Sequence, residues 1–290
     1  MNKIVNSSTF VSQLKDGMTI GIGGWGPRRK PMALIRSILA SNVKDLTIVS
    51  YGGADVGMLC AAGKVKKLVF AFVSLDFIPL EPYFRQARQN NSIEVMEIDE
   101  GMLLQGLRAA AWKIPFIPTP VGLGTDVLKH NANIKVIGSP YDDKEWVAMP
   151  ALPLDMALIH VNKADNRGNC QIIAPDRFMD DWFARAAKQT FVSCEEIVNS
   201  EYFQSPEASS KVFWERNFTT GVVHIPGGAH PSSCQPEYGF DSHHLSVYAK
   251  SIKEGGFSDY AEQFALNSEQ SYQEQVGGLT HIQSLPLPVY

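Results

Sequence analysis

The stretch DGMTIGIGGWGPRRKPMALIRSILA, residues 16–40, decides the fold. Its first part, MTIGIGG, carries no charge and predicts a buried strand. Its last part has Pro31 where a first helical turn would begin, followed by apolar residues at helical spacing. A buried strand that passes through a glycine-rich turn into an amphipathic helix is typical of parallel α/β sheets. The stretch therefore predicts the first strand–helix unit of such a sheet.

The following segments repeat this alternation of strands and helices. Further strands are expected at 45–51, 67–74, 93–98, 134–140, 146–152, 156–162 and 190–198, and helices at 55–63, 81–91, 99–111 and 180–189. We predict an α/β protein with a mostly parallel open sheet and helices on both faces. After about residue 200 the alternation of strands and helices stops, which predicts a less regular segment of helices and loops packed on a sheet that is already complete. We expect all of this to form one domain, residues 1–290.

The composition restricts the class of protein. Only 19% of the 290 residues are charged, the net charge is -4 and the basic residues are dispersed, so nucleic-acid binding is not expected. Light charging leaves apolar surface, which favours burial against a partner. The four cysteines lie far apart without a CxxC pair, as expected of core residues in a reducing compartment. The N-terminus lacks a secretory leader and no apolar run approaches about 20 residues, so we expect a cytoplasmic protein.

The glycine loop GIGGWG, residues 21–26, is the first candidate site. It matches the G-x-G-x-x-G dinucleotide fingerprint, which would make the chain a nicotinamide-dependent oxidoreductase. However, residues 27–31 separate it from the helix, and the next strand ends in Ser50-Tyr51 without the acid that would bind a ribose. A tight turn is the plain alternative. We favour a loop whose N–H groups face a substrate oxygen, with Gly24 and Trp25 among the substrate contacts.

The basic run beside this loop is the second candidate. Arg28, Arg29 and Lys30 follow the loop directly, and they either form a solvated turn or receive a carboxylate or phosphate of the substrate. Open α/β sheets bind ligands at the carboxyl ends of their strands, where this run is expected. We therefore predict substrate binding by Arg28 and Arg29.

A group of acids around residue 99 is the third candidate. Glu94 and Glu97 are expected to point outward from a strand, and Asp99 to cap the helix that follows. Glu100 would then be the first helical residue, at the carboxyl end of a parallel strand, where a general base is well placed. Gly101 costs helix stability and indicates that room is needed close by.

Other polar residues receive structural interpretations. The late histidines, among them His224 and the adjacent His243-His244, lack the spacing of metal ligands, and no metal or separate cofactor is expected. His224 is predicted to be a core or interface residue. Residues 165–169 predict a turn between two strands, and the chain contains no G-x-S-x-G elbow of a serine hydrolase.

Taken together, these motifs resemble the α subunits of family I coenzyme A transferases. The resemblance is carried by DGMTIGIGGWGPRRKP, LRAAAWKIPFIPT, GLGTD, MPALPLDMALIHVNKADNRGN and PGGAHPS, in that order along residues 16–232. It implies the open-sheet fold of this family, which is also described as NagB-like. The chain departs from the family signature at Gly21, Trp25 and Arg29, and it lacks the Ser-Glu-Asn-Gly motif that carries the nucleophile of the β subunit. The resemblance therefore implies a β subunit as partner.

A second set of motifs is more specific within the family. GWGPRRKPM, YGG, GKVK, FVSLD and DEGMLLQGLRAAA, between residues 24 and 111, resemble the α subunits of steroid ring-opening hydrolases. That resemblance implies an α2β2 heterotetramer, Glu100 as the catalytic carboxylate, and coenzyme A as part of the substrate. It implies that water opens the last ring of a cyclic β-ketothioester by retro-Claisen cleavage. The alternatives are a true coenzyme A transferase subunit for a dicarboxylate or keto acid, and a noncatalytic subunit that completes its partner's pocket.

Overall fold

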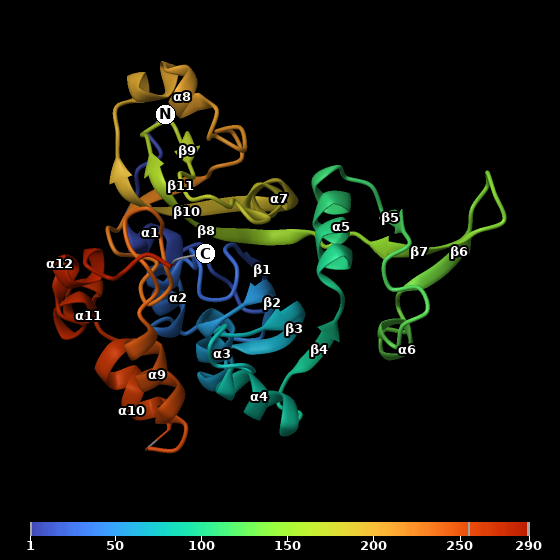
Figure 1. Ribbon diagram of the computed structural model, residues 1–290, viewed down its shortest axis with the longest axis horizontal. Helices are drawn as coiled ribbons and strands as arrows, with labels where there is room; N and C mark the ends of the chain where they lie inside the picture. The colour runs from blue at the N-terminus through green and yellow to red at the C-terminus, as the bar shows by residue number, and fades with distance from the viewer. Residues whose placement is uncertain (1, 255, 289–290) are drawn as a thin grey trace.

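The computed structural model describes residues 2–254 and 256–288, which form an α/β fold around an eight-stranded sheet (Figure 1). The strand order is β11-β10-β8-β1-β2-β3-β4, and every neighbouring pair along this path is parallel. The strands are β1 (Thr19–Ile22), β2 (Leu46–Gly52), β3 (Val65–Val73), β4 (Glu94–Glu97), β8 (Leu154–Ala164), β10 (Ala187–Ile197) and β11 (Gly221–His224). A short β9 (Cys170–Gln171) pairs antiparallel with β8. The predicted fold class is confirmed.

Helices cover both faces of the sheet because alternate strand residues point to opposite sides. Ile48 of β2 belongs to one core, with α2 (Met32–Leu39), α3 (Ala54–Ala61) and α4 (Pro82–Gln89). Val49 belongs to the other core, with α5 (Glu100–Ala111) and α7 (Asp180–Ala186). A short α1 (Ser7–Val11) adds Phe10 to the first core. Strands buried on both faces explain the nearly uncharged runs in the sequence.

A second, antiparallel sheet forms an arm that projects from the body beyond α5 (Figure 1). It has the order β5-β7-β6, and its elements are β5 (Phe116–Thr119), α6 (Val127–His130), β6 (Lys135–Gly138) and β7 (Glu145–Pro150). The prediction that the runs at 134–140 and 146–152 belong to the alternating parallel sheet is wrong. Only residues 139–144 join these two strands, and so short a link forms a hairpin, because a parallel crossover needs about a dozen residues or more.

The C-terminal segment contributes a strand to the parallel sheet as well as covering it. Residues 221–224 form β11 and extend the parallel sheet at the edge of β10, so the prediction that the sheet ends before residue 200 is wrong. A four-residue strand without flanking periodicity is too short to stand out in sequence. The remaining elements are η1 (Ser200–Gln204), α8 (Pro206–Ser209), α9 (Ser242–Ser251), α10 (Phe257–Phe264), α11 (Glu269–Gln275) and α12 (Gly278–Gln283).

Several smaller expectations can be checked directly. The cysteines are free thiols, with Cys170, Cys194 and Cys234 buried and Cys60 half-buried. Asp165 accepts hydrogen bonds from the N–H groups of Arg167 and Asn169, which confirms the predicted turn between β8 and β9. Within the described part of the chain, no helix has the length and apolarity that crossing a membrane requires.

A buried carboxylate connects the C-terminal helices to the body. Glu81 caps α4 by accepting the Phe84 N–H at 2.6 Å, and its other oxygen accepts the Tyr248 hydroxyl of α9 at 2.6 Å. Gly57 of α3 makes room for it, because a Cβ there would overlap the carboxylate. Burial raises the pKa of Glu81 to about 7, against the opposing effect of these hydrogen bonds. The stability of the contact between α4 and α9 therefore depends on whether Glu81 is protonated.

We predict that Glu81 makes folding stability fall as the pH rises from about 4.5 to about 7. The folded state holds the proton in this window, whereas the unfolded chain has already released it. Glu81→Gln should remove roughly 2–3 kcal/mol of this pH dependence. Chemical denaturation of both proteins between pH 4.5 and pH 8 measures the difference. Equal slopes for the two proteins would contradict the assignment.

Candidate active site

The glycine loop after β1 folds back onto itself. Gly24 has φ +73°, and a Cβ there would lie 2.5 Å from the carbonyl oxygen of Arg28, so only glycine fits. Trp25 and Arg28 exchange backbone hydrogen bonds of 2.9 and 2.8 Å, which close the turn. The helix α2 begins only at Met32, so the third glycine of the motif does not lie at a helix N-terminus. The loop therefore lacks the geometry of a dinucleotide fingerprint.

The N–H groups of this loop are all used within the protein. Gly23 donates to the carbonyl oxygen of Leu158 at 2.8 Å, and Gly24 donates to Oδ1 of Asp180 at 2.7 Å. Trp25 donates to Arg28 as described, and Gly26 donates to the carbonyl oxygen of Tyr51 at 3.2 Å. The prediction that these groups face a substrate oxygen is wrong, because backbone oxygens of the turn and of β8 and β2, and the Asp180 carboxylate, already accept them.

The basic run separates into buried and accessible cations. Arg29 is 1% exposed and pairs with Asp180 at 2.6 Å, while its Nη2 donates to the carbonyl oxygen of Asp176 at 2.9 Å. Lys30 is equally buried, 3.2 Å from Asp55. Burial lowers the pKa of Lys30, and the charge of Asp55 opposes that shift.

Arg28 is the accessible member of the run. Its side chain is 28% exposed and forms an ion pair of 2.5 Å with Asp76, which is itself 34% exposed. An exposed pair is held weakly, so its partner can be exchanged for another carboxylate at low cost. Of the three adjacent cations, Arg28 is the one that can meet a ligand without breaking a buried pair.

A pocket of about 470 Å³ opens beside the loop. Three segments line it, and their residues are Trp25, Arg28 and Arg29, then Ala174, Pro175, Asp176, Phe178 and Met179, then Ser233 and Gln235. Three of the four predicted substrate contacts therefore meet at one pocket. Gly24 does not line it and lies where the loop contacts α7.

Aromatic rings form one wall of this pocket. The Trp25 ring stacks on Tyr51 with a centroid distance of 5.1 Å and on Phe178 with 5.8 Å, and Phe72 packs at 4.8 Å. Phe178 has φ +52°, which costs a bulky residue backbone energy. The Arg29 guanidinium lies over the Phe178 ring at 5.3 Å, and this contact helps to hold the strained residue in place.

Glu100 lies where the sequence predicts it. The strand β4 ends at Glu97 and α5 begins at Glu100, so this carboxylate stands at the same edge of the parallel sheet as the glycine loop. Asp99 is the N-cap, as predicted, and its Oδ1 accepts the Gly101 N–H at 2.7 Å. Glu94 and Glu97 are exposed on the edge strand, also as predicted.

The environment of Glu100 alters its basicity. Desolvation raises the pKa of Glu100, and the neighbouring charge of Asp99 adds to the shift. A carboxylate with a raised pKa accepts a proton more readily, as a general base must. Gly101 provides clearance, because a Cβ there would lie 3.2 Å from Asp99 Oδ1 and 3.4 Å from a Val121 methyl. The space predicted around Gly101 therefore faces the cap and the 120–124 loop.

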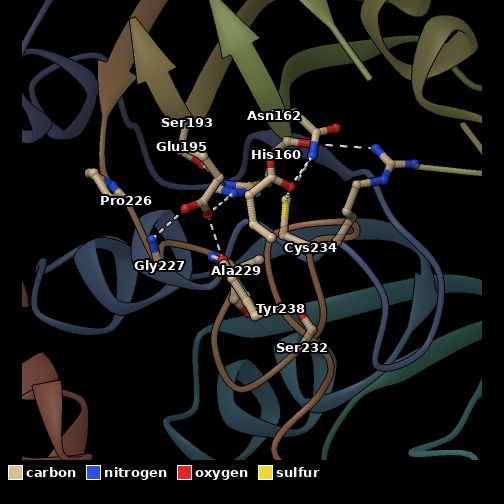
Figure 2. A network of polar contacts seen from close by, with 12 residues as sticks. His160, Asn162, Ser193, Glu195, Pro226, Gly227, Ala229, Ser232, Cys234 and Tyr238 are labelled. Carbon is tan, nitrogen blue, oxygen red and sulfur yellow. Dashed lines mark hydrogen bonds and ion pairs between the residues drawn. The ribbon is translucent and has the colours of Figure 1, made fainter. Parts of the chain in front are cut away.

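A buried polar network connects the sheet to the segment that contains the pocket residues Ser233 and Gln235, and Figure 2 shows its members. His160 of β8 bonds to Ser193 through Nδ1 and to Glu195 through Nε2, both at 2.8 Å. Glu195 also accepts the Tyr238 hydroxyl at 2.5 Å and the Gly227 N–H at 2.7 Å. The loop that contributes Ser233 and Gln235 to the pocket is thereby fixed to the sheet.

Sequence reasoning missed this network, although a signal exists. His160 and Asn162 alternate along one strand, Ser193 and Glu195 along another, and β8 and β10 pair so that Ser193 lies beside His160. Polar residues at every second position of two strands indicate a shared polar layer on one face of the sheet. His224, predicted as a core or interface residue, is exposed and contacts the Glu195 carbonyl oxygen at 3.2 Å, so the core assignment is wrong.

The network also holds three side chains of metal-binding types. Donor atoms of His160, Glu195 and Cys234 lie within 4.8 Å of one another. Both carboxylate oxygens of Glu195 already accept hydrogen bonds, and burial raises the pKa of the Cys234 thiol well above its ordinary value. A thiol that keeps its proton is a poor ligand, so the arrangement suits a hydrogen-bond network better than a metal centre.

We predict that Glu195→Gln destabilises the protein by about 2–3 kcal/mol, because it weakens bonds to His160, Tyr238 and Gly227. Burial alone would raise the pKa of Glu195, but its partners outweigh burial and lower it. Its stabilising contribution is therefore present at neutral pH and lost as the pH falls through the lowered pKa. Urea denaturation measures both effects.

The neighbouring Glu196→Gln is the matched control. Glu196 is 56% exposed and pairs with Lys163 on the surface, so its loss should cost less than about 0.5 kcal/mol. Equal costs for the two substitutions would show that the buried network does not stabilise the fold.

Comparison with known proteins assigns the chain to a protein family. Residues 6–210 match the family described as coenzyme A transferase, and the chain belongs to that family. The cholesterol ring-cleaving hydrolase IpdA subunit of Rhodococcus jostii (strain RHA1) is 42% identical over 283 residues, covering 95% of this chain and 96% of that protein. The IpdA subunit of Mycobacterium tuberculosis (strain ATCC 25618 / H37Rv) is 42% identical over 274 residues, covering 92% and 94%.

The solved structures agree with the family assignment. Glutaconate coenzyme A-transferase from Acidaminococcus fermentans superposes with a TM-score of 0.91 at 26% identity, covering 98% of this chain and 95% of that one. The resemblance deduced from the sequence motifs is confirmed for both the family and the fold.

Proposed function

We propose that this chain is the α subunit of a hydrolase that opens the last ring of a steroid-derived, cyclic β-keto coenzyme A thioester. The observation that carries the proposal is Glu100, a carboxylate of raised pKa on a capped helix start at the carboxyl edge of the sheet. The two relatives named as cholesterol ring-cleaving hydrolase subunits support the substrate class.

The reaction needs one base and balances as follows. Glu100 takes a proton from water, and the resulting hydroxide adds to the ring ketone. The C–C bond between that carbon and the α carbon of the thioester then breaks, and its electron pair forms the thioester enolate. The enolate carbon takes back the proton that Glu100 holds, which restores the base. The new carboxylic acid ionises to a carboxylate, on a product that retains coenzyme A. General-base assistance of this kind accelerates a reaction by about 10²–10⁴-fold.

The pocket beside the loop binds the part of the substrate that does not react. Arg28 exchanges its ion pair with Asp76 for a carboxylate of the substrate, and the Trp25 ring packs on the hydrocarbon. Arg29 and Gly24 maintain the shape of the pocket through their bonds to Asp180. The donors that stabilise the oxyanion come from groups other than the N–H groups of residues 23–26, which are already engaged.

The chain works with a β subunit of the same family in an α2β2 assembly, and coenzyme A enters only as part of the substrate. The two relatives are named as subunits, which supports a partner subunit, and so does the outer face of the arm. Val147 and Met149 face the α5 side and are buried, whereas their alternating neighbours form the other face. That face is mostly apolar and carries Phe116, Pro118, Ile137, Trp146, Ala148 and Pro150, with Lys135 of β6 beside Ala148 as its charged member. Apolar surface of this kind is stabilised by burial against another subunit.

We predict that Glu100→Gln in the co-expressed complex lowers kcat by at least about 10²-fold, because an amide cannot accept the proton. Only the ionised carboxylate is active, so wild-type kcat/KM should fall as the pH drops through the raised pKa of Glu100. Steady-state hydrolysis of the ring thioester across pH measures both. Glu97→Gln serves as control and should keep wild-type kcat, because Glu97 is an exposed carboxylate at the end of β4 that pairs with Arg88 of α4. Turnover of Glu100→Gln within threefold of wild type would rule out this base.

A coenzyme A transferase is the second candidate, because the chain belongs to the coenzyme A transferase family. Its acceptor would be a dicarboxylate or keto acid. A β subunit that retains the Ser-Glu-Asn-Gly nucleophile motif would favour transfer. A partner without that motif would favour hydrolysis by Glu100.

A further inference from the structure

Tyr51 connects the pocket wall to the helix start that carries Glu100. It lies at the carboxyl end of β2 and is fully buried. Its hydroxyl donates a hydrogen bond of 2.8 Å to the backbone carbonyl oxygen of Glu100. The bond is made to the backbone rather than to the carboxylate, so Tyr51 holds the residue without engaging the atoms that react.

The sheet is irregular at this point. Ser50 pairs with Phe70 of β3, whereas Gly52 pairs with Val73, so β3 has one extra residue opposite Tyr51. Bulges of this kind often re-aim side chains next to active sites. Phe72, from the bulged stretch, packs against Tyr51 with a centroid distance of 6.0 Å.

The ring of Tyr51 is held on its other side by the pocket. It stacks on Trp25, which lines the pocket, with an interplanar angle of 12°. Desolvation raises the pKa of Tyr51, and the charges of Glu100 and Asp99 add to the shift, so the hydroxyl remains a donor throughout the working pH range. A single side chain thus contacts both the pocket wall and the first residue of α5.

We propose that Tyr51 is a positioning residue that fixes Glu100 relative to the Trp25 wall of the pocket. The inference rests on the proposed function, in which Glu100 is the base. The first turn of a helix is the part that frays, and here Asp99 and Tyr51 both restrain it. Reaction rates respond steeply to such restraint, since a misplacement of about 1 Å can cost about 10²-fold.

The test is Tyr51→Phe in the complete complex with the β subunit, assayed on the ring thioester. This substitution keeps the ring stacked on Trp25 and removes only the hydroxyl. We expect kcat to fall roughly 3- to 10-fold, the effect of losing one ordinary hydrogen bond, with KM within about twofold of wild type. Hydrogen exchange should accelerate in the peptide that covers the first turn of α5.

Tyr83→Phe is the matched control. Tyr83 is also buried, and its substitution also removes one hydrogen bond, which joins its hydroxyl and that of Ser251 at 2.6 Å. However, Tyr83 contacts the C-terminal helices instead of the pocket. It should keep wild-type kcat and wild-type exchange at α5. An equal loss of kcat in both variants would reduce the effect of Tyr51 to general destabilisation and overturn the proposal.

A double-mutant cycle separates this proposal from the proposed function. In the Glu100→Gln background, measured in single turnovers at high enzyme concentration, Tyr51→Phe should have no further effect. The same loss in both backgrounds, or a change in KM alone, would overturn the positioning role and leave Glu100 as the base. Wild-type turnover by Glu100→Gln would instead remove the base, and the role of Tyr51 with it.

Discussion

The carboxylate of Asp180 is the constraint on which the site depends. One of its oxygens accepts the Gly24 N–H and the other pairs with Arg29, both fully buried. Removing one partner from a buried pair typically costs about 3–5 kcal/mol, because the other charge is left without compensation. Arg29 in turn holds the carbonyl oxygen of Asp176 and lies over Phe178. The glycine loop, α7 and the 174–179 segment are therefore locked into one arrangement, and the pocket is the space that this arrangement leaves.

The parallel topology explains why the other residues gather nearby. Strands β1, β2, β3 and β4 are neighbours and run in the same direction, so their carboxyl ends share one edge of the sheet. Trp25 follows β1, Tyr51 and Phe72 lie near the ends of β2 and β3, and Glu100 follows β4. The ends of four neighbouring strands and the residues that directly follow them thus supply the pocket wall, the link to Glu100 and the base. This is the edge where open α/β sheets generally bind their ligands.

Local pattern was enough to predict much of this. The uncharged strand runs and the capped start of α5 are periodic or positional signals, so the parallel sheet, the Asp99 cap and the place of Glu100 could be derived from the residues alone. Whether that carboxylate is the base came from family resemblance. Contacts between distant segments could not be derived. Arg29 meets Asp180 through tertiary packing that no spacing in the sequence encodes. For His160 and Glu195, the alternation of polar residues indicates a buried polar layer but not which side chains pair in it. Tertiary packing also supplies the acceptors for the loop N–H groups that the sequence predicts to face an oxyanion. It likewise allows the four-residue β11 to join the sheet.

In the proposed reaction, water activated by Glu100 breaks a C–C bond while coenzyme A stays on the product. Turnover of the ring thioester by the complete complex in ¹⁸O-labelled water tests it most directly, with mass spectrometry of the product at early times. We expect ¹⁸O in the newly formed carboxylate and an intact thioester on the same molecule. An unlabelled product, together with coenzyme A transferred to an added carboxylic acid, would contradict it.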